Sequence, residues 1–344
     1  MYRRYSVIIL LSIDRGKFGV IAGVVLLMLS LVIALAGGEF LLRLRPELRP
    51  ERRWYVGERT PRVSTNFETD PVTGWRMKAN HSFVWHIGRD SAVYTSNAQG
   101  MRAPNDFSDR CGGRRIVMVG DSYFFGTGVA IDKTIGSQLA DSLSHRFDVY
   151  NVAMPGFGID QIWMSLRHKA LALCPALIVV GFIDDDWNRS LTAYRTDMRM
   201  TKPTFVLEGD SLRPQRPSDR PGALKSLVLE HSALWRAMEF VSRKLSYRTG
   251  RGEWFRLNAA MLEAMASDAR SKGVPILFVR VPARDNWRSI PALRWEMARI
   301  PAPYIDLADP SVKRSDIYLA GDGHLNSRGA AYVAGKIAEW ILRR

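Results

Sequence analysis

The stretch that decides the fold reads "RRIVMVGDSYFFGTG" and runs from Arg114 to Gly128. Its first part, "IVMVG", is a short run rich in β-branched residues that ends at a glycine, which is typical of a buried parallel strand. The second part places Gly-Asp-Ser directly after that strand and before a glycine-rich turn. In an open parallel sheet, ligands bind at the carboxyl ends of the strands. We therefore expect Ser122 to lie at the ligand-binding edge of a sheet.

Strand-like and helix-like segments alternate downstream of this stretch. Strands at this spacing, separated by helices, indicate a parallel sheet with helices on both faces. We predict a three-layer α/β/α sandwich with a flavodoxin-like parallel sheet, interrupted by an insertion at about 189–254. The predicted strands are 148–158, 176–183, 275–282 and 303–307, and the predicted helices are 134–147, 159–173, 256–273 and 327–344.

An uncharged apolar run near the N-terminus, residues 18–38, has about the 20 residues needed to cross a bilayer. Basic residues precede the run and favour a cytoplasmic location for residues 1–17, although basic residues also follow it. A removed signal peptide is the alternative, because Ala34-Leu35-Ala36 offers a small-residue cleavage site. The length of the run favours an uncleaved transmembrane helix.

Two segments separate this run from the α/β domain. Residues 39–53 form a charged, proline-containing linker. Residues 54–110 are rich in turn formers and contain the strand-like pieces "HSFVWHI" and "SAVYTSN". They predict a small β-containing subdomain, which leaves residues 111–344 for the α/β domain.

The chain is strongly basic, with a net charge of +15. Basic charge suits nucleic acid, an anionic membrane surface or an acidic polymer. The basic residues are scattered and no nucleic-acid-binding signature accompanies them, so we expect no nucleic-acid partner. Two cysteines are too few for a zinc site, and we expect no metal and no cofactor.

The triplet Gly-Asp-Ser occurs twice, in different surroundings. The second copy, in "FVLEGDSLRP", lies between two short strand-like pieces and has the composition of a hairpin tip. Ser122 follows a strand and precedes a turn, which is the rigid position that a nucleophile needs. We therefore expect Ser122, and not Ser211, to be the nucleophile.

Partners for Ser122 lie near the C-terminus, in "LAGDGHLNSRG". Asp322 precedes His324 by two residues in a glycine-flanked loop, and residues two apart in an extended segment point to the same side. Asp322 would then orient the imidazole of His324 as the general base for Ser122. The alternative is that Asp322 and Asn326 are turn and capping residues beside an exposed histidine.

Three blocks, in this order, resemble the SGNH (GDSL-type) hydrolases. "VMVGDSYFFGTGV" is similar to the nucleophile block, "VYNVAMPGFG" to the block whose glycine supplies an oxyanion N–H, and "DGHLNSRG" to the block with the catalytic Asp and His. The resemblance implies that Ser122, His324 and Asp322 are catalytic. It also implies an oxyanion hole at the N–H groups of Ser122 and Gly156, and an α/β/α sandwich with strand order 2-1-3-4-5.

One block departs from the family pattern. Members usually carry Gly-x-Asn-Asp after the third strand, and the Asn side chain is another oxyanion donor. Here "VVGFIDDDWNRS" has Asp184, Asp185 and Asp186 with no Asn in register. Asn188, two residues later, is the nearest amide, and it is the alternative oxyanion donor if the loop bends. An ionised carboxylate cannot donate a hydrogen bond. The acidic trio is either a loop that supports the site or a solvated turn.

The resemblance also bears on whether the two cysteines form a disulfide. Cys111 and Cys174 precede the first and third strands, which are neighbours in the family's strand order. A disulfide between them is geometrically plausible and fits an oxidising periplasm. Two buried free thiols are the alternative.

The resemblance implies a serine esterase or O-acyltransferase. We expect residues 18–38 to anchor it in the bacterial inner membrane, with the C-terminal domain in the periplasm. "DPVTGWRMKAN" and "YTSNAQGMRAP" resemble the region upstream of the catalytic domain in exported members, which often act on acylated surface polysaccharides. The expected substrate is therefore an acylated glycan or a small ester. The alternative function is a non-catalytic protein that binds polysaccharide or organises an envelope assembly.

Overall fold

A five-stranded parallel sheet forms the centre of the computed structural model, which describes residues 15–45, 65–87, 90–108, 110–191, 193–195, 198, 200–215, 232–284 and 287–344. The strands lie in the order β13-β12-β7-β5-β6, and all neighbours are parallel. Numbered along the chain, this is the expected order 2-1-3-4-5. The five strands are β5 (Arg115–Val119), β6 (Asp148–Asn151), β7 (Leu177–Phe182), β12 (Ile276–Arg280) and β13 (Tyr304–Asp306).

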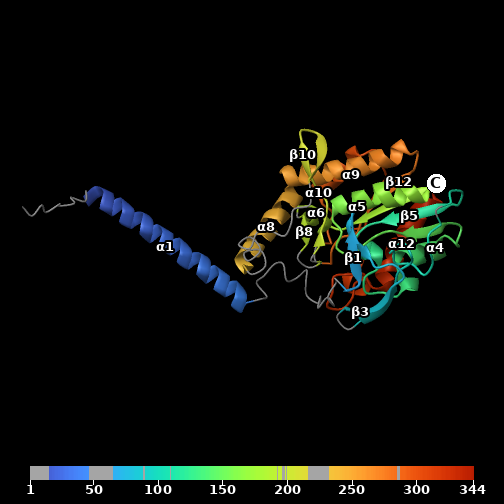
Figure 1. Ribbon diagram of the computed structural model, residues 1–344, viewed down its shortest axis with the longest axis horizontal. Helices are drawn as coiled ribbons and strands as arrows, with labels where there is room; N and C mark the ends of the chain where they lie inside the picture. Colours follow the sequence, from blue (N-terminus) through green and yellow to red (C-terminus); the bar gives the residue numbers. More distant parts are fainter. Residues whose placement is uncertain are drawn as a thin grey trace, which may run out of the picture.

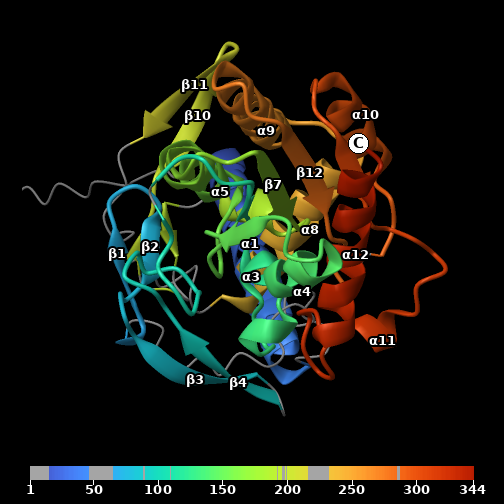
Figure 2. The same ribbon diagram turned by 90° about the vertical axis from the view of Figure 1, so that its right-hand side faces the viewer.

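Helices cover both faces of this sheet, so the predicted three-layer sandwich is confirmed (Figures 1 and 2). One layer contains α4 (Ile135–Ser142) and α12 (Ser327–Leu342), which pack against each other. The other contains α5 (Ile159–Ser165) and α9 (Glu253–Ser271). Further helices are α10 (Pro291–Arg299), α11 (Arg314–Ile317), the 3-10 turns Ile131–Lys133 and Leu171–Leu173, and the π-helical turn Leu166–Ala170.

The three central strands explain why the sheet forms. Every residue of β5, β7 and β12 is buried, as expected for strands with helices on both faces. Arg280, the last residue of β12, is fully buried between Asp184 and Asp306. A buried cation of this kind requires such paired carboxylates.

Two β-hairpins precede the sheet domain, within the range 54–110 for which the sequence predicts a small β-containing subdomain. Trp75 donates its indole N–H to the carbonyl of Pro155, and Gln161 donates to the carbonyl of Thr73 at 2.6 Å. These contacts attach the first hairpin to the loop after β6 and to α5, which contains Gln161. The hairpin strands are β1 (Phe67–Asp70), β2 (Gly74–Met77), β3 (Ser82–Ile87) and β4 (Asp90–Thr95).

The second Gly-Asp-Ser triplet lies at the tip of a hairpin, which confirms its interpretation. Gly209 has φ +62 in the turn between β10 (Thr204–Glu208) and β11 (Ser211–Gln215). This hairpin belongs to the predicted insertion, which lies between β7 and α9. The insertion also contains α6 (Asp186–Arg189), β8 (Tyr194–Arg195), β9 (Met200–Thr201) and α8 (Ala233–Thr249).

The apolar run near the N-terminus lies within α1 (Arg15–Leu44), which extends away from the domain (Figure 1). By length and composition, Val20–Leu44 is able to cross a membrane. The assignment of 39–44 to a linker is wrong, because the apolar stretch "FLLRL" continues the helix and Arg43 pairs with Glu39 one turn earlier at 2.6 Å. Residues 1–14 and 46–64, which hold most of the predicted N-terminal segment and linker, lie outside the described residues.

Candidate active site

Ser122 is the first residue of the short helix α3 (Ser122–Phe125), directly after β5. Asp121 caps this helix, because its carboxylate accepts the N–H of Tyr123 at 3.0 Å. A residue at the first helical position has no acceptor for its N–H within the helix. The sequence thus gives Ser122 a rigid position and leaves its backbone N–H available to a ligand.

A glycine in the neighbouring strand makes room for α3. A Cβ atom at Gly181, in β7, would lie 1.9 Å from the ring of Phe124. The ring therefore packs directly against the strand backbone. This contact fixes the helix that carries Ser122 on the carboxyl end of the sheet.

The structure brings Ser122 together with the two residues predicted from the C-terminal block. His324 Nε2 lies 2.9 Å from Ser122 Oγ, and His324 Nδ1 lies 2.6 Å from Asp322 Oδ1. Asp322 also accepts the backbone N–H of His324 at 2.7 Å. Asp322 and Asn326 still cap locally, but the alternative of an exposed histidine is wrong, because the His324 side chain is only 12% exposed.

The surroundings of Asp322 decide which imidazole nitrogen carries the proton. Burial raises the pKa of Asp322, but the hydrogen bond and charge of His324 outweigh burial and hold that pKa below its ordinary value. The ionised carboxylate accepts only, so Nδ1 of His324 must be the donor. Nε2 then presents a lone pair to the hydroxyl of Ser122, as a general base requires.

A buried cluster of charged side chains lies beside Ser122, and it was not predicted from the sequence. Asp121 and Asp186 are both fully buried, and Arg189 Nη1 lies 3.5 Å and 2.6 Å from their carboxylates, respectively. Burial raises the pKa of Asp121, and burial together with the charge of Asp121 raises the pKa of Asp186 well above its ordinary value. The spacing of Asp186 and Arg189, three residues apart on a helix, is the one sequence signal for this cluster.

The acidic trio is not a solvated turn. Asp184 binds both Nε and Nη2 of the buried Arg280, at 2.7 and 3.0 Å. Asp185 pairs with Arg189 at 3.1 Å and also accepts the side-chain amide of Asn188 at 3.3 Å. The trio therefore supports the loop through two arginines. The amide of Asn188 is directed to Asp185, and no contact between Asn188 and Ser122 is present among the described residues.

Gly156 lies in the turn after β6, with φ +77, a conformation that favours glycine. Its carbonyl accepts a hydrogen bond from Arg195 of the insertion at 2.8 Å. Trp75 also lies close to this turn, where an added Cβ at Gly156 would meet the indole at 3.6 Å. The insertion and the N-terminal subdomain thus hold the turn predicted to supply the second oxyanion N–H.

The N-terminal subdomain also holds the turn that follows α3. The hydroxyl of Tyr94 accepts the N–H of Gly128 at 2.6 Å. Arg102 donates to the carbonyls of Phe125 and Val129 at 3.2 and 2.6 Å, and its guanidinium lies 3.9 Å from the centre of the Tyr94 ring. These contacts between Tyr94, Arg102 and the turn after α3 have no local signal in the sequence.

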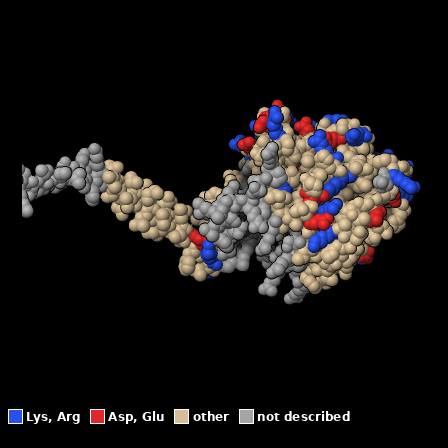
Figure 3. All heavy atoms as spheres, viewed as in Figure 1, with Lys and Arg blue, Asp and Glu red and all other residues tan. Residues whose placement is uncertain are grey.

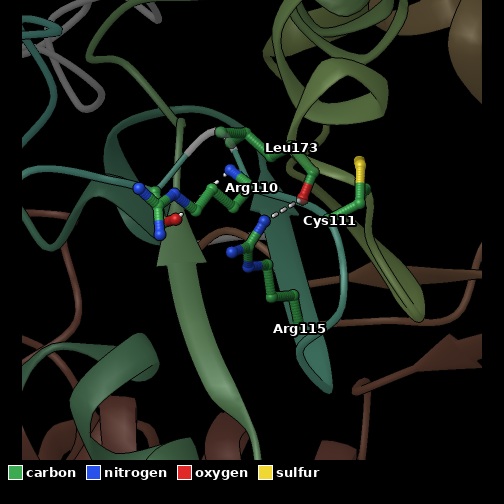
Figure 4. The surroundings of a disulfide bond; sticks show 6 residues. Arg110, Cys111, Arg115 and Leu173 are labelled. Carbon is green, nitrogen blue, oxygen red and sulfur yellow. Dashed lines mark hydrogen bonds between the residues drawn. A yellow bond between two sulfur atoms is a disulfide. The ribbon is translucent and has the colours of Figure 1, made fainter.

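Cys111 and Cys174 form a disulfide, with their Cα atoms 5.4 Å apart (Figure 4). Beside it, Arg115 at the start of β5 donates to the carbonyl of Leu173 at 2.9 Å. Both contacts join the segment before β5 to the segment before β7. Among the described residues, no group of three or more His, Cys, Asp or Glu side chains is arranged to hold a metal ion.

Comparison with known proteins finds similarity at the level of solved structures. No family model and no curated protein matches the sequence. TesA matches with 13% identity and a TM-score of 0.40, over 66% of this chain and 97% of that one. The lipase/acylhydrolase from Enterococcus faecalis matches with 16% identity and a TM-score of 0.38, over 66% and 95% of the two chains.

A third structure, AlinE4, an esterase of the SGNH-hydrolase family, matches with 13% identity and a TM-score of 0.37, over 68% of this chain and 97% of that one. Hydrolases and esterases of the SGNH type are thus the solved structures to which this chain is similar.

Proposed function

We propose that this chain is a serine esterase or O-acyltransferase of the SGNH type that acts on acyl esters of a cell-envelope glycan. The observation that carries the proposal is the contact chain from Ser122 Oγ through the His324 imidazole to the Asp322 carboxylate. Three residues with these distances and this tautomer match what nucleophilic acyl transfer requires.

In the first half of the reaction, Ser122 Oγ attacks the ester carbonyl carbon while His324 Nε2 takes the hydroxyl proton. The tetrahedral intermediate then collapses, its C–O bond breaks, and His324 returns the proton to the departing alcohol. The product is an acyl-enzyme on Ser122. Asp322 stabilises the imidazolium that forms between the two proton transfers.

The backbone N–H groups of Ser122 and Gly156 are the proposed oxyanion donors. Ser122 contributes the N–H that has no acceptor within α3, and Arg195 and Trp75 both contact the left-handed turn at Gly156. Preorganised donors of this kind stabilise the charge that develops in the transition state. The family's third donor has no equivalent at Asp184 or Asp186, because both carboxylates are bound to arginines.

Deacylation distinguishes the two reaction types. An acceptor O–H gives its proton to His324 Nε2 and attacks the acyl carbon. The bond between the acyl carbon and Ser122 Oγ then breaks, and His324 returns the proton to Ser122 Oγ. Water as acceptor gives hydrolysis, and a sugar hydroxyl gives transfer to a glycan. The proposed location is the periplasmic face of the inner membrane, supported by the apolar helix α1 and by the Cys111–Cys174 disulfide.

The test uses the two Gly-Asp-Ser triplets as a matched pair. Full-length protein in detergent is assayed for release of nitrophenol from p-nitrophenyl acetate. Ser122→Ala should lower kcat by a factor of about 10³ or more, whereas Ser211→Ala, at the tip of the β10–β11 hairpin, should retain the wild-type rate. Wild-type turnover by Ser122→Ala would overturn the mechanism.

The acceptor is identified by adding oligosaccharides to the same assay. A transferase releases nitrophenol and produces acetylated sugar in equal amounts, with little free acetate. A hydrolase produces acetate at the same rate whether or not sugar is present. Either product supports acyl-enzyme chemistry and decides which of the two activities the chain has.

A non-catalytic glycan-binding role is the second candidate, favoured by the side chain of Asn188, which donates to Asp185. This role predicts binding of acylated polysaccharide by both the wild type and Ser122→Ala, with no ester turnover in either. Isothermal titration calorimetry with the same oligosaccharides provides the comparison.

A further inference from the structure

Helix α8 of the insertion carries a stripe of large apolar side chains exposed to solvent. Trp235, Met238, Val241 and Leu245 are 47%, 57%, 59% and 62% exposed. At roughly 100° per residue, these four positions and Leu234 fall within an arc of about 120° on the helix. Exposed apolar surface of this extent marks a site of interaction.

The end of α1 contacts the start of this stripe. The side chain of Leu234 lies 3.7 Å from the position of an added Cβ at Gly38. Glu39 accepts the backbone N–H groups of Ala233 and Leu234 at 2.9 and 2.8 Å, and the hydroxyl of Ser232, the N-cap residue, at 3.0 Å. A carboxylate at this position satisfies the free N–H groups of the helix and complements its dipole.

Helix α8 also contacts the rest of the domain. Ala233 in its first turn is fully buried, and α8 contacts α9 and α10, which connect it to the catalytic domain. In Figure 1, α8 leads from the end of α1 toward these helices. The exposed apolar stripe therefore lies on the element that joins the domain to α1.

The composition of α8 is that of an interfacial helix. Its 17 residues include four basic residues and one acidic residue, "ALWRAMEFVSRKLSYRT". Helices with an apolar face, a tryptophan and excess basic charge lie in the headgroup region of bilayers that contain anionic lipid. Figure 3 shows the visible face of α1 without charged atoms until its end, where acidic and basic atoms appear. This end, with its Glu39–Arg43 pair, marks the bilayer boundary.

We propose that α8 lies on the outer surface of the bilayer that α1 crosses, with Trp235, Met238, Val241 and Leu245 inserted among the lipids. This inference rests on the membrane-anchor part of the proposed function, and it adds a second membrane contact that α1 alone does not supply. Glu39 links the two contacts, since it belongs to α1 and caps α8. The catalytic domain is thereby held at the membrane surface in one orientation.

The test places an environment-sensitive fluorophore at single cysteines in the full-length protein, reconstituted into nanodiscs of mixed neutral and anionic lipid. The native Cys111–Cys174 disulfide leaves only the introduced thiol to react. Met238→Cys and Leu245→Cys report on α8. Leu342→Cys, 55% exposed on α12, is the matched control, and Val32→Cys, 58% exposed, reports on α1.

Lipids that carry a spin label near the headgroup should quench positions 238 and 245 at least threefold more than position 342. Quenching by aqueous iodide should be stronger at position 342 than at positions 238 and 245. A deeply placed spin label should quench position 32 most strongly. Quenching at 238 and 245 equal to that at 342 would overturn the inference, and so would shielding from iodide without quenching by lipid, which indicates a protein partner. No quenching at position 32 would instead contradict the anchor itself.

Variants of Glu39 test whether this residue connects α8 to α1. Glu39→Ala should reduce lipid quenching at position 245 toward the value at position 342, while quenching at position 32 stays unchanged. Glu39→Gln keeps a carbonyl oxygen that can accept an N–H of α8, so it should retain most of the quenching. Equal quenching in Glu39→Ala and the wild type would show that Glu39 does not hold α8 at the membrane.

Discussion

Arg189 Nη1 lies 3.5 Å from Asp121 Oδ2, so the residue that precedes Ser122 belongs to a buried ion pair. The same guanidinium lies 2.6 Å from Asp186, and both carboxylates are fully buried. Removing a buried charge's only compensating partner typically costs 3–5 kcal/mol. The loop at the position where SGNH hydrolases usually carry an Asn thus contributes a cation to the segment that carries the proposed nucleophile.

Arg189→Met should lower the free energy of unfolding by about 3 kcal/mol, because it leaves two buried carboxylates without this cation. The measurement is denaturant unfolding of the full-length protein at pH 7. Combining Arg189→Met with Asp186→Asn should recover part of the loss. The control is Arg167→Met, whose half-exposed side chain pairs with Asp268 at 3.7 Å and should lose about 1 kcal/mol or less. Equal losses in the two single variants would contradict the role of the cluster.

Asp322→Asn should lower kcat by a factor of about 10⁴, because the amide can impose the wrong imidazole tautomer on His324. KM should change little, since Asp322 contacts His324 and not the substrate in the proposed mechanism. Steady-state kinetics on p-nitrophenyl acetate measure both constants. An unchanged kcat would show that His324 is not oriented through Asp322.

We also predict that the contribution of Asp322 to the stability of the folded protein depends on pH. The pKa of Asp322 in the folded protein lies below its ordinary value of 3.8, so its contribution to stability is complete above that value and is lost as the pH falls through the folded-state pKa. The difference in Tm between the wild type and Asp322→Asn should shrink as the pH falls below about 4. A difference that grows over this acidic range would contradict this sign.

Arg102→Lys should reduce stability by about 2 kcal/mol, because an ammonium cannot reproduce the several hydrogen bonds that a guanidinium makes to the turn after α3. It should also lower kcat, since that turn follows Ser122. Thermal unfolding and ester turnover are measured together. The matched control is Arg76→Lys, a partly exposed residue paired with Glu68, which should change stability by less than about 1 kcal/mol. Similar effects of the two variants would contradict the proposal that Arg102 stabilises the turn after α3.

Reduction of the Cys111–Cys174 disulfide should also destabilise the protein. The bond closes a loop with a sequence separation of 63, for which the chain-entropy model gives about 4 kcal/mol. Dithiothreitol should therefore lower the Tm of the wild type and leave that of a Cys111→Ser/Cys174→Ser variant unchanged. Alkylation of both thiols in denatured, unreduced protein would show that the bond does not form.

The positions of Ser122, Asp322 and His324 could be predicted because they depend on local patterns, whereas the strand order was implied by the resemblance to the SGNH hydrolases. A β-branched run marks β5, a hairpin composition marks the second triplet, and a two-residue spacing brings Asp322 to His324. Each of these signals is contained in a few neighbouring residues.

Arg189, Arg102 and Glu39 could not be assigned their contacts in this way. Arg102 reaches a turn more than twenty residues away, and Glu39 caps a helix that begins nearly two hundred residues later. Such pairs depend on how the subdomain, the insertion and α1 pack together. The acidic trio illustrates the same limit, because its burial depends on Arg280 from a neighbouring strand.

Covalent labelling of Ser122 tests the central claim most directly. Full-length protein is treated with a fluorophosphonate, digested with trypsin and analysed by mass spectrometry, in parallel with His324→Ala. We predict an adduct on Ser122, none on Ser211, and a large loss of labelling in His324→Ala because the general base is missing. Folded protein with the wild-type Tm that carries no adduct on Ser122 would contradict the proposed mechanism.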